Sequence, residues 1–184
     1  VSTGSSNLDD LDLHPLFILP DPGDNKRYCE KKDINKIPDT LDQKILPEIK
    51  DKIGKISIID EYFNIKNVNR AVGTRISYHL LEKYGHEKIK EDFLTLKFKG
   101  SAGQSFGAFG IKGLKLQLEG DANDYVAKGL SGATISIKLP KDSNLISYEN
   151  TIIGNTVLYG ATSGKLFASG KAGERFAVRN SGAT

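Results

Sequence analysis

Residues 102–108 read Ala-Gly-Gln-Ser-Phe-Gly-Ala, and residues 172–178 read Ala-Gly-Glu-Arg-Phe-Ala-Val, so an Ala-Gly pair and a phenylalanine recur in the same places. The second stretch continues to a Ser-Gly-Ala-Thr ending at 181–184, which residues 131–134 share. The alignments place the starts of four repeat units near Ala102, Ala122, Gly154 and Ala172. Their spacing is roughly 20 residues once 140–150 is treated as an inserted loop, which is typical of one coil of a stacked β structure.

Short stretches between the glycines alternate apolar with polar residues. Residues 114–118 read Leu-Lys-Leu-Gln-Leu and residues 135–139 read Ile-Ser-Ile-Lys-Leu, a pattern that gives a strand one buried and one exposed face. The glycines, among them Gly132 and Gly164, are expected at corners that need positive φ or a close approach of neighbouring coils. One repeat position is expected to form an inward apolar column: Phe106, Val126, Leu158 and Phe176. The pattern predicts a mainly β fold, a solenoid of parallel coils over residues 93–184.

Residues 1–24 are predicted to be a flexible or extended tail. Residues 1–12 are small, polar and acidic, so they bury too little to offset their ordering entropy. The apolar run Leu16–Leu19 lies between prolines, which favours an extended segment. That segment is expected either to lie on a partner surface or to pack as a strap on its own domain.

Residues 25–92 are predicted to be a small α-helical and extended region that leads into the solenoid. Thr40 and Gln43 have the spacing of a capping box, and apolar residues follow at helical spacing as far as Ile53, which predicts a helix. Pro47 is expected to kink or split it.

Two further elements are expected before the solenoid. Residues 56–65 are rich in β-branched and aromatic side chains, which predicts a strand. Residues 71–84 carry apolar side chains four apart and are followed by Gly85, which predicts a second helix with a glycine cap.

Composition excludes several classes of function. The 184 residues carry 26 basic and 23 acidic side chains, interleaved along the chain, with a formal net charge of +3, which disfavours nucleic-acid binding. The single cysteine, Cys29, excludes an internal disulfide and a cysteine-ligated zinc or iron–sulfur site. It also favours a reducing compartment. No apolar run reaches the roughly 18–20 residues that cross a bilayer, so a cytoplasmic protein is expected.

No catalytic, cofactor-binding or metal-binding residue is predicted in this chain. The glycine-rich run 100–113 lacks the Gly-Lys-Ser/Thr ending of a phosphate-binding loop. Asp121, Asn123 and Asp124 resemble part of a calcium-binding repeat, but the full repeat is absent, so turn formation and backbone capping are expected of them. The three histidines, His14, His79 and His86, are scattered and make a weak metal site.

Longer motifs carry a family resemblance. They include Gly-Ser-Ala-Gly-Gln-Ser-Phe-Gly-Ala-Phe at 100–109, Leu-Glu-Gly-Asp-Ala-Asn-Asp-Tyr-Val at 118–126, Lys-Gly-Leu-Ser-Gly at 128–132, Leu-Tyr-Gly-Ala-Thr-Ser-Gly at 158–164 and Ala-Gly-Glu-Arg-Phe at 172–176. Together they resemble the C-terminal glycine-motif (GXGXG) domain of the glutamate synthase large subunit. The resemblance extends from about Arg27 to the end of the chain and is densest after Ile65.

The resemblance implies a single-stranded right-handed parallel β-helix and a non-catalytic role. In the parent enzyme of glutamate biosynthesis and ammonia assimilation, such a domain packs against the glutaminase and flavin-binding domains and helps to hold them in register. The FMN, the iron–sulfur cluster and the catalytic residues then belong to other domains. The family domain normally continues past the motif at 180–182, so the last coil here is expected to be an open edge, which a partner or a second copy could cover.

Two alternatives remain open at the level of the sequence. The chain is expected either to dock against glutaminase and flavin-binding domains, in the same or a separate chain, or to be a stand-alone paralogue. A paralogue of that kind would act as a small-ligand-binding module, a minor enzyme or a self-associating scaffold. Whether the chain itself is an enzyme is therefore left undecided by its sequence.

Overall fold

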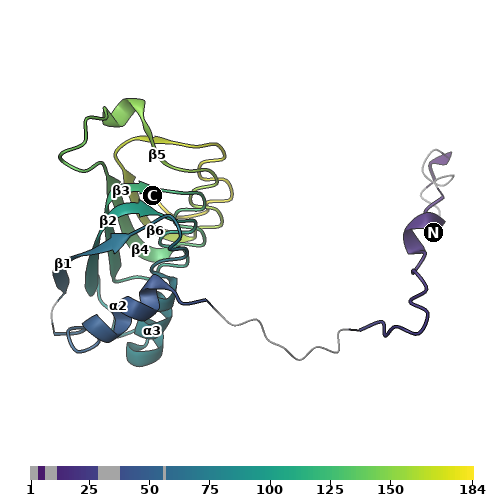
Figure 1. The fold of residues 1–184 in the computed structure, drawn as a ribbon, viewed down its shortest axis with the longest axis horizontal. Coiled ribbons are helices and arrows are strands. Elements are labelled where there is room, and N and C mark those ends of the chain that lie inside the picture. The colour runs from purple at the N-terminus through teal and green to yellow at the C-terminus, as the bar shows by residue number, and fades with distance from the viewer. Residues whose placement is uncertain (1–3, 7–11, 29–37, 56) are drawn as a thin grey trace. The chain divides into compact units, whose positions relative to one another are not determined.

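The chain forms two compact units, Val1–Ile37 and Pro38–Thr184. A computed structural model describes residues 4–6, 12–28, 38–55 and 57–184, so Cys29 and residues 1–3 and 7–11 of the predicted tail lie outside the described residues. In the first unit, the short 3-10 helix η1 spans His14–Phe17. The predicted apolar run Leu16–Leu19 is 71–78% exposed. All other helices and strands among the described residues belong to the second unit (Figure 1).

The second unit is built on a parallel sheet. Its seven strands are β1 (Ile58–Ile65), β2 (Leu94–Ala102), β3 (Leu114–Ala122), β4 (Ser131–Lys138), β5 (Thr151–Ile153), β6 (Ser163–Ala168) and β7 (Lys171–Ala172). The order along the sheet is β1-β2-β3-β4-β6, while β5 pairs with β3 and with β7. A 3-10 helix, η2 (Ser147–Glu149), lies in the loop between β4 and β5. The inserted loop thus separates two strands of the same sheet.

The predicted repeat is confirmed by the strand register. The starting residues pair in the sheet: Ala102 with Ala122, Ala122 with Ile153, and Ile153 with Ala172. The third unit therefore starts one residue before the predicted Gly154. Each repeat adds one parallel strand beside the previous one, in chain order from β2 to β4.

The chain returns between strands through stacked turns with left-handed backbone. Equivalent residues in four successive turns have φ between 56° and 66°: Ser105, Tyr125, Thr156 and Arg175. Backbone hydrogen bonds join one turn to the next at this position: Ser105 N donates to Asp124 O at 2.8 Å, Tyr125 N to Asn155 O at 2.9 Å, and Thr156 N to Glu174 O at 2.8 Å. Figure 1 shows these turns stacked on the side of the unit opposite the strands.

The predicted fold class, a mainly β single-stranded right-handed parallel β-helix, is wrong. The strands form one parallel sheet of seven, and two helices belong to the same unit, an α/β arrangement. The physical reason lies in the returns, because residues with left-handed φ do not form a β ladder. Each repeat therefore contributes a strand on one side and a turn on the other. Buried residues of both helices, Ile45 and Ile49 in the first and Ile76 and Leu80 in the second, belong to the same hydrophobic cluster as those of the strands.

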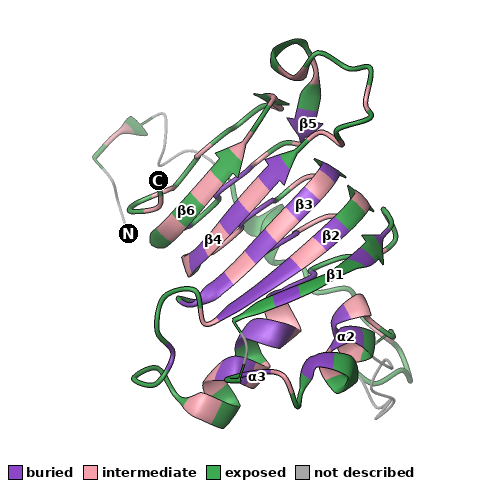
Figure 2. Ribbon diagram, turned by 90° about the vertical axis from the view of Figure 1, so that its left-hand side faces the viewer, coloured by how far each residue is buried: buried purple, intermediate pink, exposed green. Residues whose placement is uncertain are grey.

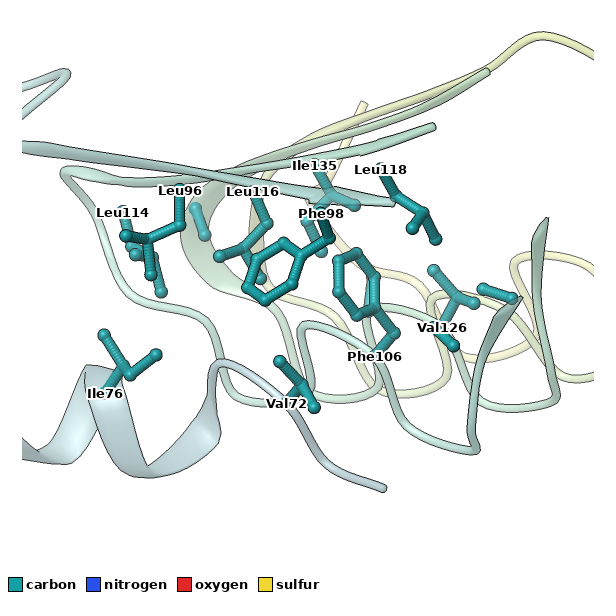
Figure 3. Packing of buried hydrophobic residues seen from close by; sticks show 14 of the residues in the cluster. Val72, Ile76, Leu96, Phe98, Phe106, Leu114, Leu116, Leu118, Val126 and Ile135 are labelled. Atoms are coloured by element: carbon teal, nitrogen blue, oxygen red, sulfur yellow. The ribbon is translucent and has the colours of Figure 1, made fainter. Parts of the chain in front are cut away.

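The core lies between the sheet and the stacked turns. Leu114, Leu116 and Leu118 of β3 are buried, as the alternating pattern predicted. Phe98 of β2 packs on Phe106 of the first turn, with ring centroids 5.6 Å apart and planes at 88° (Figure 3). Each fully buried side chain of this kind contributes about 1.5–3 kcal/mol.

Two helices close one end of this core. Helix α2 (Leu41–Ile49) begins with the predicted capping box, in which Gln43 N donates to Thr40 Oγ1 and Thr40 N donates to Gln43 Oε1. Pro47 lies in its last turn without splitting it, and the helix ends two residues later. Helix α3 (Thr74–Tyr84) ends at Gly85, as predicted. No helix in the described ranges is long and apolar enough to cross a membrane.

Asp42 joins the two helices. The first residue before α3, Gly73, has no side chain to cap the helix. The buried carboxylate of Asp42 accepts hydrogen bonds from Gly73 N at 3.0 Å, Arg75 N at 2.9 Å and Ile76 N at 3.2 Å. A side chain of α2 therefore caps α3, where unsatisfied N–H groups would otherwise remain.

Candidate functional site

The described residues bring together no cluster of three or more His, Cys, Asp or Glu side chains that could hold a metal ion. His79 lies on α3, His86 follows that helix, and His14 belongs to the other unit. Cys29 lies outside the described residues.

The polar residues after β3 bond to neighbouring turns. Ser101 Oγ donates to Asp121 Oδ1 at 2.7 Å, and Asn123 Nδ2 donates to Asn67 Oδ1 at 2.9 Å. Asp124 Oδ1 accepts from Asn155 N at 2.7 Å. In the next turn Asn155 repeats this contact by accepting from Glu174 N at 2.7 Å. Asp124 and Asn155 thus satisfy backbone donors of the following turn, whereas the other two bonds join side chains.

The solvent-facing side of the sheet pairs several of its own charges. Lys97 Nζ lies 2.7 Å from Asp60 Oδ1, and Lys138 Nζ lies 3.0 Å from Glu119 Oε1. The hydrogen bond from Lys138 lowers the pKa of Glu119 despite the opposing effect of partial burial, and a second bond from Tyr62 acts in the same direction. A face that neutralises its own charges offers little electrostatic attraction to a partner.

The edge of the sheet that carries β6 differs from the rest of the sheet in how far its side chains are exposed. We call residues 163–184, which include β6, β7 and the last turn, the β6 face. Along β6 exposed and half-buried residues alternate, whereas along β3 buried and half-buried residues do (Figure 2). Phe167 is 57% exposed and Phe176 is 52% exposed. Large apolar side chains therefore lie open on the outermost layer.

Phe176 shows the difference most clearly. Interlayer hydrogen bonds align it with Phe106, Val126 and Val157, which are at most 1% exposed. The predicted apolar column is thus correct for its first two members. Its third member is Val157 in place of Leu158, and its fourth, Phe176, is not buried. The side chain at this repeat position is thus buried in the first three layers and exposed to solvent in the fourth.

Backbone groups of the last turn are open as well. In the second of the four turns, Tyr125 N and Gly129 N donate to carbonyl groups of the third turn. The equivalent N–H groups of Arg175 and Arg179 have no acceptor within the described part of the chain. Such groups, next to exposed apolar side chains, form an edge on which further polypeptide can add hydrogen bonds.

A hollow of about 630 Å³ opens beside the β6 face. Its walls include small residues at the starts of β4 and β6, together with Lys112, Lys115 and Lys165. Lys115 lies 3.9 Å from Asp92, while Lys112 and Lys165 form no ion pair among the described residues. The lining also includes Glu91 and Asp92, so three lysines accompany two carboxylates at the edge of an apolar patch. Charged groups around exposed apolar side chains are typical of docking surfaces.

Comparison with known proteins assigns a family to this arrangement. The family model of the GXGXG motif matches residues 42–184. The large chain of the NADPH glutamate synthase of Azospirillum brasilense is 51% identical over 184 residues, which are 100% of this chain and 12% of that protein. The NADH glutamate synthase of Saccharomyces cerevisiae is 46% identical over 177 residues, 95% of this chain and 8% of that protein.

A third relative has the same relation to the chain. The large chain of the NADPH glutamate synthase of Bacillus subtilis is 46% identical over 173 residues, 94% of this chain and 11% of that protein. The chain thus spans about a tenth of the length of each of these relatives.

Proposed function

The chain belongs to the GXGXG motif family, and from this premise we propose that it is a non-catalytic docking domain of a glutamate synthase-type enzyme. The resemblance seen in the sequence motifs is confirmed by the family match and by the glutamate synthase large chains among its relatives. In this proposal the domain serves glutamate biosynthesis and ammonia assimilation. It holds glutaminase and flavin-binding domains in register, in the cytoplasm.

The β6 face is the observation on which the proposal mainly rests. It combines exposed Phe167 and Phe176 with the N–H groups of Arg175 and Arg179, which have no acceptor among the described residues. Because the relatives are roughly ten times longer than this chain, they contain many segments that could cover such a face. Burying its apolar side chains and pairing its N–H groups would stabilise the assembly.

The proposal assigns the FMN and the iron–sulfur cluster of the family to other domains. The fit with this chain is poor, since its one cysteine cannot supply the several thiolates that a cluster needs. No step of the reaction is therefore assigned to residues of this chain.

A chimeric enzyme tests the docking role. The matching segment of the Azospirillum brasilense large chain is replaced by these 184 residues, and glutamine hydrolysis and glutamate formation are measured separately. In the chimera, Val178→Asp is expected to lower glutamate formed per glutamine hydrolysed about tenfold, which corresponds to roughly 1.4 kcal/mol of lost docking energy. The matched control is Val68→Asp, at a valine that is 80% exposed on the loop after β1.

Equal effects of the two valine changes, or none from either, would show that the β6 face docks nothing. A stand-alone function predicts a different result with the 184-residue chain alone. Turnover above background, or flavin retained through purification, would favour a small enzyme or ligand-binding module. A concentration-dependent dimer in light scattering that Val178→Asp abolishes would favour a self-associating scaffold.

A further inference from the structure

A second feature, apart from the β6 face, lies between the two helices. Helices α2 and α3 pack side by side at the end of the core near β1 (Figure 2). A cavity of about 550 Å³ lies between them, lined by Thr40, Asp42 and Leu46 on one side and by Ala71, Thr74, Arg75, Tyr78 and His79 on the other. Its volume is within the range of small-molecule sites, roughly 300–1,000 Å³.

The one carboxylate in this lining is already bonded. Both oxygens of Asp42 accept backbone N–H groups at the start of α3. Burial raises the pKa of Asp42, and the bonds from Gly73, Ile76 and Arg75 oppose that rise. The carboxylate therefore serves the start of the helix, where backbone N–H groups already bond to both of its oxygens.

The positively charged side chains of the lining, in contrast, have no ion-pair partner among the described residues. The guanidinium group of Arg75 forms no hydrogen bond or ion pair within the described ranges, and its charge lowers the pKa of Asp42 through space. It also lines an adjoining hollow of about 280 Å³, whose far end is formed by Lys50. Lys50 likewise has no ion-pair partner among the residues described. Two adjoining hollows thus share a guanidinium group that has no ion-pair partner within the described ranges and interacts with Asp42 only at longer range.

A polar ring and apolar walls complete the lining. His79 lines both hollows, and its Nε2 is closed off from solvent without a hydrogen-bond partner in the described structure. Leu46 and Ala71 supply apolar surface, and Tyr78 supplies an aromatic ring whose hydroxyl group is bonded to Glu82. A guanidinium group beside such walls matches a ligand with a carboxylate at one end and an apolar body at the other.

We propose that the cavity between α2 and α3 binds a small organic carboxylate, with Arg75 as the residue that holds its carboxylate group. The carboxylate meets the planar fork of Arg75 through two parallel hydrogen bonds. The apolar body of the ligand lies against Leu46, Ala71 and the ring of Tyr78. This site goes beyond the proposed docking function and does not depend on it.

Titration of the 184-residue chain with phenylpropionate tests the site, with nuclear magnetic resonance shifts of the His79 ring and the Arg75 side chain as the readout. Saturable binding is expected. Arg75→Gln should weaken it about tenfold or more, since charge-assisted bidentate bonds are lost. Arg75→Lys, which keeps the charge without the fork, should give an intermediate affinity.

Two controls make the result decisive. Arg175→Gln removes the same group from the β6 face, away from the helices, and should leave the affinity unchanged. Phenylpropanol, which lacks the carboxylate, should not saturate. The substitution at Arg75 keeps its backbone N–H bond to Asp42, so these variants should fold. The proposed site would be wrong if phenylpropionate gave shifts that do not saturate. It would also be wrong if Arg75→Gln bound phenylpropionate with the parent affinity, or if phenylpropanol bound equally well.

Discussion

The carboxylate of Asp42 takes the place of a side-chain cap that Gly73 cannot provide. Asp42→Asn can keep its amide oxygen on the N–H groups of Gly73, Arg75 and Ile76 only by turning its NH₂ group toward Gly73 N. The charge-assisted bonds then become neutral ones and two donors face each other. The free energy of unfolding is expected to fall by about 1–3 kcal/mol. Urea unfolding measures this, with Asp51→Asn as the control on an exposed carboxylate. Equal losses in both variants would mean that the cap contributes nothing.

The same carboxylate makes stability depend on pH. Burial raises the pKa of Asp42 in the folded state above its ordinary value of 3.8, so the folded chain binds a proton more tightly than the unfolded chain. Stability from this group is fully present below 3.8 and is lost as the pH rises through the folded pKa. The free energy of unfolding of the parent protein should therefore exceed that of Asp42→Asn by more in acid than at neutral pH.

Urea unfolding of both proteins across that range checks the pH dependence. The substitution removes only this titrating group, so the other carboxylates cancel in the difference. If the difference in free energy of unfolding between the parent protein and Asp42→Asn grew with pH, the N–H bonds to the carboxylate would outweigh the cost of its burial.

Among the elements, the start of β4 depends on a glycine. Gly132 has φ +112°, and a Cβ there would lie 2.8 Å from Lys112 N and 2.9 Å from Lys112 Cα. Gly132→Ala therefore adds a clash with backbone to a strained φ, and about 2–4 kcal/mol should be lost. Gly160 has φ +66° with nothing within 4 Å, so Gly160→Ala should lose only about 1–2 kcal/mol. Thermal and urea unfolding compare the two variants.

Valine at Gly132 or Gly164 is expected to be worse than alanine, because a branched side chain widens the clash. Gly164 has the same arrangement at the start of β6, with φ +109°. If Gly132→Ala and Gly160→Ala lost the same stability, the close approach of neighbouring segments would not matter and backbone strain alone would explain both.

These elements also show why part of the fold could be predicted from the sequence. Alternation at 114–118 identified β3, and the capping box at Thr40 identified α2, because both depend on residues close together in the chain. The returns could not be predicted. Tyr125 and Thr156 adopt left-handed φ, which their residue types disfavour, and the bonds between layers hold them there. The positive φ predicted at Gly132 and Gly164 is correct, but left-handed φ also occurs at non-glycine residues in every return, and no glycine pattern marks those.

At the scale of the whole molecule, the candidate sites depend on contacts between distant residues. Asp42 caps a helix that begins at Thr74, and no pattern of neighbouring residues in the sequence predicts such a contact. The cavity of Arg75 exists only because α2 and α3 pack together. In contrast, the Phe106 and Phe176 repeat is visible in the sequence, but the difference in their burial appears only when the layers are stacked. The proposed docking face and the proposed cavity site thus both depend on how the layers and helices are assembled.

Amide hydrogen exchange tests how far the β6 face is completed by other polypeptide. In the isolated chain, amides of β3, which is paired on both sides, should exchange slowly, whereas Arg175 N–H and Arg179 N–H should exchange fast because they have no acceptor in the described structure. In the chimera with the Azospirillum brasilense large chain, these two amides should become protected while β3 stays unchanged. Fast exchange of both amides in the chimera would show that the last turn remains open there, and that docking, if it occurs, uses another surface.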